Sequence, residues 1–260
     1  YTLSARLVGE GRLPYRDFAF PQGPAYAFLL APFVRLVPSL YTPRAISVVC
    51  TAISVGLLVA TARRVGGKWA AYATCGALLA TIPSLPYWLS ITKTYALTCL
   101  FLSAIVFTLT TTVRPAVRYP IAAALAVGLV ETRPTGFALA ALLIAALLWM
   151  APDSATRVHT LFAAAAASLP FVALVLLDWS GAHWALFEYH QLGAKGGGGF
   201  GQFSSRTFSV VHAWPGPALL GAVALIVALV NRDIRARLAR RLDLVAVAIG
   251  MVLFIVLHEA

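Results

Sequence analysis

Long apolar runs separated by short polar stretches dominate the chain. A helix needs about 20 mainly apolar residues to cross the hydrocarbon core of a bilayer. Five runs reach or approach that length, and another begins at residues 244–257. The pattern predicts an all-α fold, a polytopic bundle of membrane helices with about eight membrane segments. The five runs are residues 45–62, 69–89, 95–113, 159–177 and 215–230.

Three shorter apolar runs need a different interpretation. Residues 119–130 and 135–150 flank a polar turn that contains Glu131 and Arg133, so we expect a hairpin of half-length helices. The turn should then lie at some depth in the membrane. Residues 23–37 are interrupted by a proline and an arginine, which leaves about a dozen apolar residues. That length is typical of an interfacial or re-entrant segment.

The basic residues indicate an orientation. Loops that face the cytoplasm carry more Lys and Arg than those outside, and residues 231–243 hold five arginines. With this loop inside, strict alternation gives 11 basic residues inside and 9 outside. The whole chain is then one transmembrane domain. Its parts are an outside loop (1–22), an interfacial or re-entrant segment (23–37), a helix bundle (45–177), a large outside loop (178–214) and the last helices (215–260).

Composition supports the membrane assignment. Hydrophobic residues make up 60% of the chain and charged residues 11%, with a mean hydropathy of +0.85, which excludes an ordinary water-soluble domain. The net charge of +11 would favour nucleic acid in a soluble chain. Here no basic stretch is interleaved with stacking aromatics, so we expect membrane lipid and no nucleic acid as partner. Frequent Ala, Arg and Val favour a GC-rich bacterial genome, and hence the bacterial cytoplasmic (inner) membrane.

The cysteines and the chain ends add little chemistry. Cys50, Cys75 and Cys99 lie in separate apolar runs without metal-ligand spacing, so they are expected to be core residues. We predict no metal site and no cofactor. Because residue 1 is Tyr and an apolar run is still in progress at Leu257, we expect the sequence to be part of a longer chain.

Turn formers, aromatics and charges are concentrated in residues 9–24. One interpretation is a compact element outside the membrane whose acid, Asp17, and bases, Arg12 and Arg16, meet a polar headgroup. The other is a connector in which Asp17 caps a helix or pairs with Arg16.

Three stretches of the sequence together resemble a known protein family. The stretch GEGRLPYRDFAFPQGPAYAFLLAPFVRL, then Arg44 opening a span that ends in ATARRVGGKWAAYA, and the turn GLVETRPTGFALA occur in this order. Together they resemble the first part of membrane glycosyltransferases of the GT-C superfamily. The similarity is to family 39, which groups protein O-mannosyltransferases with bacterial aminoarabinose transferases, and it covers roughly residues 1–150.

The resemblance implies an enzyme that takes a sugar from a polyprenyl-phosphate donor on the extracytoplasmic face and inverts its anomeric carbon. It places the main catalytic base a few residues before Tyr1, with Asp17 as a weaker candidate. A second acid found in the family near the span at residue 95 is absent, because Lys93 and Tyr95 stand there. This absence agrees with the prediction of no metal.

Glycosyl transfer explains which other residues are needed. A carboxylate deprotonates the acceptor hydroxyl, and the leaving phosphate needs stabilising positive charge. Without a metal, the candidates for binding the donor phosphate are Arg16, Lys93 and Arg133. Arg133 also has two structural interpretations, which are a local pair with Glu131 and snorkelling to the headgroups.

The predicted outside loop 178–214 is rich in groups that suit a sugar. Aromatic rings stack on sugars, while carboxylates and imidazoles hydrogen-bond them. The alternative is an ordinary surface loop. The candidate acceptor-binding residues are Trp184, Glu188, Tyr189 and His190.

Two other functions stay open on the sequence. A non-enzymatic transporter or lipid-linked-sugar flippase would fit the half-length hairpin, although no inverted repeat is evident. A structural membrane subunit is favoured if the outside loops are dispensable.

Overall fold

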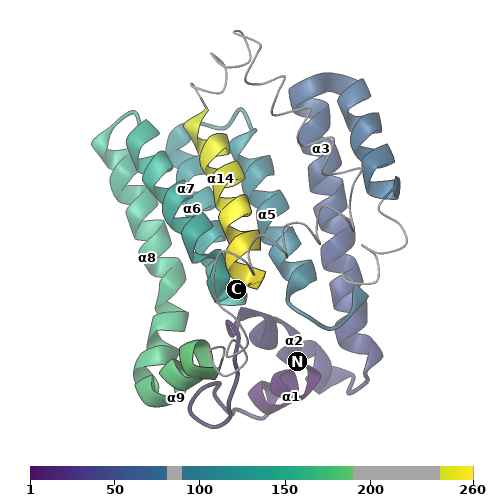
Figure 1. Ribbon diagram of the computed structural model, residues 1–260, viewed down its shortest axis with the longest axis vertical. Helices are drawn as coiled ribbons and strands as arrows, with labels where there is room; N and C mark the ends of the chain where they lie inside the picture. Colours follow the sequence, from purple (N-terminus) through teal and green to yellow (C-terminus); the bar gives the residue numbers. More distant parts are fainter. Residues whose placement is uncertain (81–89, 190–240, 260) are drawn as a thin grey trace.

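Long helices run alongside one another, and a layer of short helices lies across one end of them (Figure 1). The computed structural model describes residues 1–80, 90–189 and 241–259, and every regular element within these ranges is helical. The predicted all-α fold is confirmed for this part of the chain.

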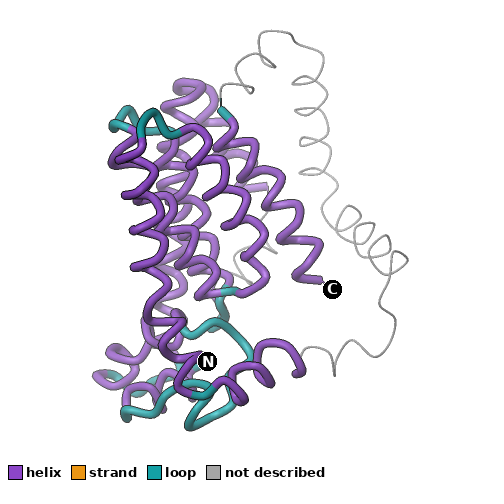
Figure 2. Tube along the Cα trace, turned by 90° about the vertical axis from the view of Figure 1, so that its left-hand side faces the viewer, coloured by secondary structure: helices purple, strands orange, loops and turns teal. Residues whose placement is uncertain are grey.

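The long helices alternate in direction, so their connections lie at two ends of the bundle (Figures 1 and 2). In packing, α3 contacts α5, α5 contacts α6, and α6 contacts both α7 and α8, while α14 packs on α7. These helices are α3 (Tyr41–Ala80), α5 (Tyr95–Leu109), α6 (Pro115–Thr132), α7 (Phe137–Met150), α8 (Ser154–Leu177) and α14 (Leu242–Glu259).

One end of the bundle carries what we call the end layer. It contains α1 and α2, the connecting residues 10–24, and the short helical segment that follows α8 (Figure 1). We call the other end of the bundle the opposite end. The connections after α5 and α7 lie there. The helical elements of the end layer are α1 (Thr2–Gly9), α2 (Ala25–Leu36), α9 (Trp179–His183) and the π-helical turn η2 (Trp184–Glu188).

Helix α3 consists of two helices joined at Gly67. The backbone of Gly67 has φ 74° and ψ −165°, a conformation that side chains with a Cβ rarely adopt. The helical path therefore breaks there, at the opposite end of the bundle. This break agrees with two predicted runs, 45–62 and 69–89, although residues 81–89 lie outside the described residues.

Within the described part of the chain, two helices are long and apolar enough to cross a membrane, Tyr41–Leu78 and Ser154–Leu177. Large apolar side chains point outward from both, and Phe162 on α8 is 73% exposed. Outward apolar faces of this kind suit contact with lipid rather than water. The other described apolar helices are shorter, so the number of crossings stays a prediction.

Small residues allow the central helices to approach closely. Ala122, Ala123 and Ala126 on α6 are fully buried in a cluster shared with α5, α7 and α14. Gly250 allows α14 to approach α7 closely, because a Cβ there would lie 2.6 Å from the Cα of Leu139. Apolar surface in lipid gains little from burial, so close backbone approach supplies much of the packing energy.

Three sequence-based boundaries need correction. The predicted outside loop 1–22 contains α1, and the predicted outside loop 178–214 begins as α9 and η2 rather than as loop. The first arm of the predicted hairpin, α6, has 18 residues, because Pro115 starts the helix four residues before the predicted run 119–130. The predictions for residues 190–214 and 215–230 fall outside the described residues.

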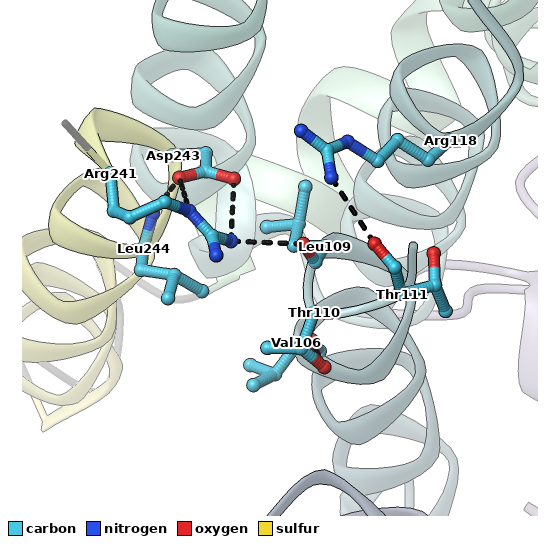
Figure 3. Close-up of polar contacts among 8 residues, drawn as sticks. All are labelled: Val106, Leu109, Thr110, Thr111, Arg118, Arg241, Asp243 and Leu244. Carbon is cyan, nitrogen blue, oxygen red and sulfur yellow. Dashed lines mark hydrogen bonds and ion pairs between the residues drawn. The ribbon is translucent and has the colours of Figure 1, made fainter. Parts of the chain in front are cut away.

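At the opposite end, charged side chains fasten α14 to α5 (Figure 3). Arg241 contacts both carboxylate oxygens of Asp243 at 3.0 Å and donates to the carbonyl of Leu109 at 2.9 Å. Asp243 is fully buried, so its charge depends on this pair. Arg118 of α6 donates to the carbonyl of Thr111 at 3.2 Å beside them. The contacts of Arg241 with Asp243 and Leu109 set where α14 lies along the bundle.

We expect Asp243→Ala to lower the free energy of unfolding by about 3 kcal/mol, because it leaves Arg241 without its buried partner. The matched control is Asp153→Ala. Asp153 lies at the same end and caps α8 by accepting the Thr156 N–H at 2.7 Å, so the loss of this exposed cap lowers the free energy of unfolding by less than the loss of the buried pair. Unfolding by SDS titration in mixed micelles, followed by circular dichroism, compares the two. Equal losses would contradict the proposed role of the buried pair.

Candidate functional site

Arg16 and Asp17 form an ion pair in the turn that precedes α2. Arg16 Nε and Nη2 donate to the two oxygens of Asp17 at 2.9 and 3.0 Å, and the Leu13 N–H donates to Asp17 at 2.7 Å. The hydrogen bonds from Arg16, and then from Leu13, lower the pKa of Asp17 below its ordinary value. A lowered pKa makes the carboxylate a weaker base. The contacts are those of the second interpretation, a connector held by the pair.

Tyr15 fixes the shape of this connector. Its φ of 71° is unusual for a residue with a Cβ, and its hydroxyl donates to the carbonyl of Gln22 at 2.7 Å. The buried ring packs with Phe20 against Leu174 at the end of α8. Burial first, and then the nearby Glu131 carboxylate, raise the pKa of Tyr15. Tyr15 therefore joins the connector to both α8 and the end of α6.

The connector also touches the polar turn after α6 through its backbone. A Cβ on Gly23 would overlap the carbonyl group of Glu131, so only glycine fits there. The first loop and the ETRPTG turn, two of the motifs behind the family resemblance, are thus in direct contact. The contact between these two motifs places the polar turn beneath the end layer.

Arg133 is 5% exposed at the C-terminal end of α6. Its backbone leaves the helix in an extended conformation, and its carbonyl accepts the N–H of Gly136 at 2.8 Å. Its guanidinium carbon lies 4.6 Å from the ring centre of Tyr95 at the start of α5. The Lys93 ammonium lies 5.7 Å from the same ring centre. Two of the three cations predicted to bind phosphate thus meet at one aromatic ring.

Among the described residues, no ion pair joins Glu131 to Arg133. The local pair that was one interpretation of Arg133 is therefore not formed. The Glu131 carboxylate instead lies beside the backbone N–H of Phe171 in α8. Its Oε1 atom is buried and has no hydrogen-bond partner. An unsatisfied buried carboxylate oxygen is costly, which makes it a feature that requires explanation.

The start of α5 is positioned by hydroxyl groups. The hydroxyls of Tyr26 and Ser47 lie 2.7 Å apart, and Ser47 also lies within hydrogen-bond distance of the Ile91 carbonyl at 3.2 Å. These contacts tie α2, α3 and the segment before α5 together. Lys93 and Tyr95 therefore stand on a supported stretch of backbone.

Three of the four predicted acceptor-binding residues lie in the end layer, and His190 falls outside the described residues. The rings of Trp184 and Tyr189 lie 5.7 Å apart, and both are exposed. Glu188 Oε1 contacts His183 Nδ1 at 3.1 Å. The cluster presents polar groups beside aromatic rings, as sugar-binding surfaces do.

Sequence reasoning missed two residues of the site. The His183 ring lies between those of Trp179 and Phe187, tilted by 40° and 33°, with ring centres 5.9 and 5.6 Å away. Their spacing of four residues was the available signal. Tyr95 appeared only as a departure from the family pattern. No local signal shows that its ring would face Arg133, because the two residues belong to different helices.

Arg16 is not part of the Tyr95 cluster, because its guanidinium contacts Asp17 in the connector instead. Nor do three or more His, Cys, Asp or Glu side chains come together as a metal site anywhere in the described ranges. No protein-family model matches this chain, and no curated protein or solved structure matches it.

The Gly23 contact can be tested by adding one methyl group. Gly23→Ala is expected to lower the thermal unfolding midpoint in detergent, because the Glu131 backbone must move, at a cost of about 1–3 kcal/mol. Gly56→Ala is the control, since a Cβ there meets nothing within 4 Å inside a helix. That change should raise the midpoint slightly. A Gly23→Ala midpoint at or above the wild type would contradict the contact.

Proposed function

We propose that this chain is an integral membrane glycosyltransferase of the GT-C type, similar to family 39. It transfers a sugar from a polyprenyl-phosphate donor to an acceptor on the extracytoplasmic face of a bacterial inner membrane, with inversion. The proposal includes the finer architecture, a polytopic bundle of about eight membrane segments. The observation that carries it is the pair of cations, Arg133 and Lys93, at the Tyr95 ring beneath the end layer.

A buried guanidinium suits the leaving group of this reaction. Positive charge held at membrane depth costs about 2.5–3.5 kcal/mol, so it is retained where it has a function. The departing polyprenyl phosphate gains negative charge as the glycosidic bond breaks, and preorganised cations stabilise that charge. The Tyr95 ring gives the Arg133 guanidinium a cation–π contact, and this contact brings no negative charge of its own.

The end layer supplies a surface for the acceptor near the same turn. Tyr15 packs with Ala182 of α9 and Ala185 of η2, and η2 and the residue after it carry Trp184, Glu188 and Tyr189. We assign Asp17 to holding the connector rather than to proton transfer, because three hydrogen bonds occupy its carboxylate. The donor phosphate and the acceptor would thus meet at one end of the bundle.

The phosphate role is tested by binding of undecaprenyl phosphate, the product of the donor half-reaction. Arg133→Gln in the full chain is expected to weaken this binding by about 10–100-fold, the effect of losing a charged hydrogen bond. Arg64→Gln is the matched control, since Arg64 also stacks on a ring, Phe107 at 4.2 Å, but lies exposed beside the Gly67 break. Native mass spectrometry in detergent measures both affinities.

Tyr95→Phe keeps the ring and should retain affinity within about threefold, whereas Tyr95→Leu removes the cation–π contact. Unchanged binding in Arg133→Gln, or equal loss in Arg64→Gln, would exclude the proposed phosphate site. Release of undecaprenyl phosphate from undecaprenyl-phosphate-linked sugars then measures transfer itself.

The transporter alternative is favoured by one observation, the buried Glu131 oxygen without a partner. An intramembrane acid of this kind is typical of ion-coupled transport. Under the glycosyltransferase proposal, Glu131→Gln should leave undecaprenyl phosphate binding unchanged within about twofold, because the carboxylate faces Phe171 and Tyr15 rather than the Tyr95 ring. The transporter is favoured if wild-type protein in proteoliposomes moves a substrate in response to a pH gradient, Glu131→Gln abolishes that movement, and neither protein binds undecaprenyl phosphate.

A further inference from the structure

A groove lies between the C-terminal ends of α1 and α2, separate from the Tyr95 cluster. Its volume is about 890 Å³, and it is open to the surface of the end layer. The residues that give it its character are Arg6, Gly9, Glu10, Val34, Arg35 and Pro38. Basic and apolar groups therefore line one depression.

The groove carries more positive than negative charge. Arg6 Nε donates to Glu10 at 3.0 Å, one turn along α1, which holds the Arg6 guanidinium at the rim. Arg35 is exposed and makes no hydrogen bond or ion pair within the described residues. Two guanidinium groups against one carboxylate favour an anion. Arginine presents a planar set of donors that matches phosphate oxygens.

Gly9 of α1 lies beside Ala31 and Arg35 of α2 and keeps the groove open there. A Cβ there would lie 3.4 Å from the Ala31 carbonyl oxygen and 3.6 Å from the Arg35 Cβ. A larger side chain at this point would fill the space between α1 and Arg35. The two arginines can therefore face a common ligand.

Helix α2 points an apolar face outward beside the groove. Its inner face buries Tyr26, Leu30 and Val34. Its outer face carries Phe33 and Leu36, and Leu36 is 80% exposed. The apolar outer surface continues after the helix through exposed Val37, Leu40 and Tyr41.

A helix of 12 residues is too short to cross a bilayer. An exposed apolar face with arginine at its border suits the boundary between headgroups and acyl chains. In that position the face contacts acyl chains, and the arginines lie at the level of lipid phosphates. The charge and the apolar face thus point to the same amphiphilic partner.

We infer that the groove between α1 and α2 binds the phosphate of an anionic bilayer lipid, with the outer face of α2 inserted among the acyl chains. This site is distinct from the proposed undecaprenyl phosphate site and does not depend on transfer activity. It would anchor the end layer to the membrane surface and so keep the Tyr95 cluster at a constant depth.

The test uses the full chain in detergent and phosphatidylglycerol as probe, with phosphatidylcholine for comparison. Native mass spectrometry measures the affinity for each lipid. Arg6→Gln and Arg35→Gln should each weaken phosphatidylglycerol binding about fivefold, the effect of one basic residue at an anionic surface, and the double variant about twentyfold. Phosphatidylcholine binding should not change.

Arg63→Gln is the matched control, because Arg63 is exposed next to the Gly67 break at the opposite end. Leu36→Gln should also weaken phosphatidylglycerol binding if the acyl chains lie on α2. Undecaprenyl phosphate binding measured on the same samples should stay at the wild-type value, which separates this site from the one at Arg133.

Unchanged phosphatidylglycerol affinity in the double variant would overturn the inference, as would an equal loss in Arg63→Gln. Displacement by glycerol 3-phosphate at the lipid's own concentration, with no effect of Leu36→Gln, would also overturn it and assign the groove to a soluble phosphate. Because both arginines are exposed, their substitution should leave the thermal unfolding midpoint unchanged. Measuring that midpoint separates a loss of lipid binding from unfolding of the variant.

Discussion

The close approach of Gly23 to the Glu131 carbonyl group is the constraint on which the end layer depends. Two backbones meet there, and backbone atoms cannot turn away as side chains do. The contact brings the connector over the polar turn at the end of α6. Tyr15 then fills the space beside it, with its ring against α8 and its hydroxyl on Gln22. Loop and bundle form one packed unit because this approach is possible.

A second constraint is the cost of charge in an apolar bundle. Arg133 is nearly fully buried, and its position against Tyr95 offers the guanidinium a polarisable surface without cancelling its charge. Asp243 shows the other solution, in which Arg241 neutralises a buried carboxylate and ties two helices together. The same physical cost is thus met by an ion pair at one end of the bundle and by a cation–π contact at the other.

Apolar packing alone would leave the helices free to slide. Large apolar side chains occur on the outer surfaces of α3 and α8 as well as in the core, so hydrophobicity does not distinguish one helix face from another. Small residues and polar contacts make that distinction. Ala126 lies in the close-packed centre, Gly250 meets α7, and the Ser47 hydroxyl holds the start of α5. Register in this bundle therefore depends on a few small or polar residues.

The sequence by itself determined the helical class, the short length of α2 and the polar turn at Arg133. Each follows from the length of an apolar run or from a charge inside one, and these are local properties. It did not show that residues 2–9 and 179–188 are helical, because helices this short are stable only through packing on neighbours such as Leu174.

Only the tertiary structure decided that Arg133 faces Tyr95 and that Glu131 turns toward α8. Those contacts join residues far apart in the chain, and helix packing rather than sequence spacing sets which of them meet.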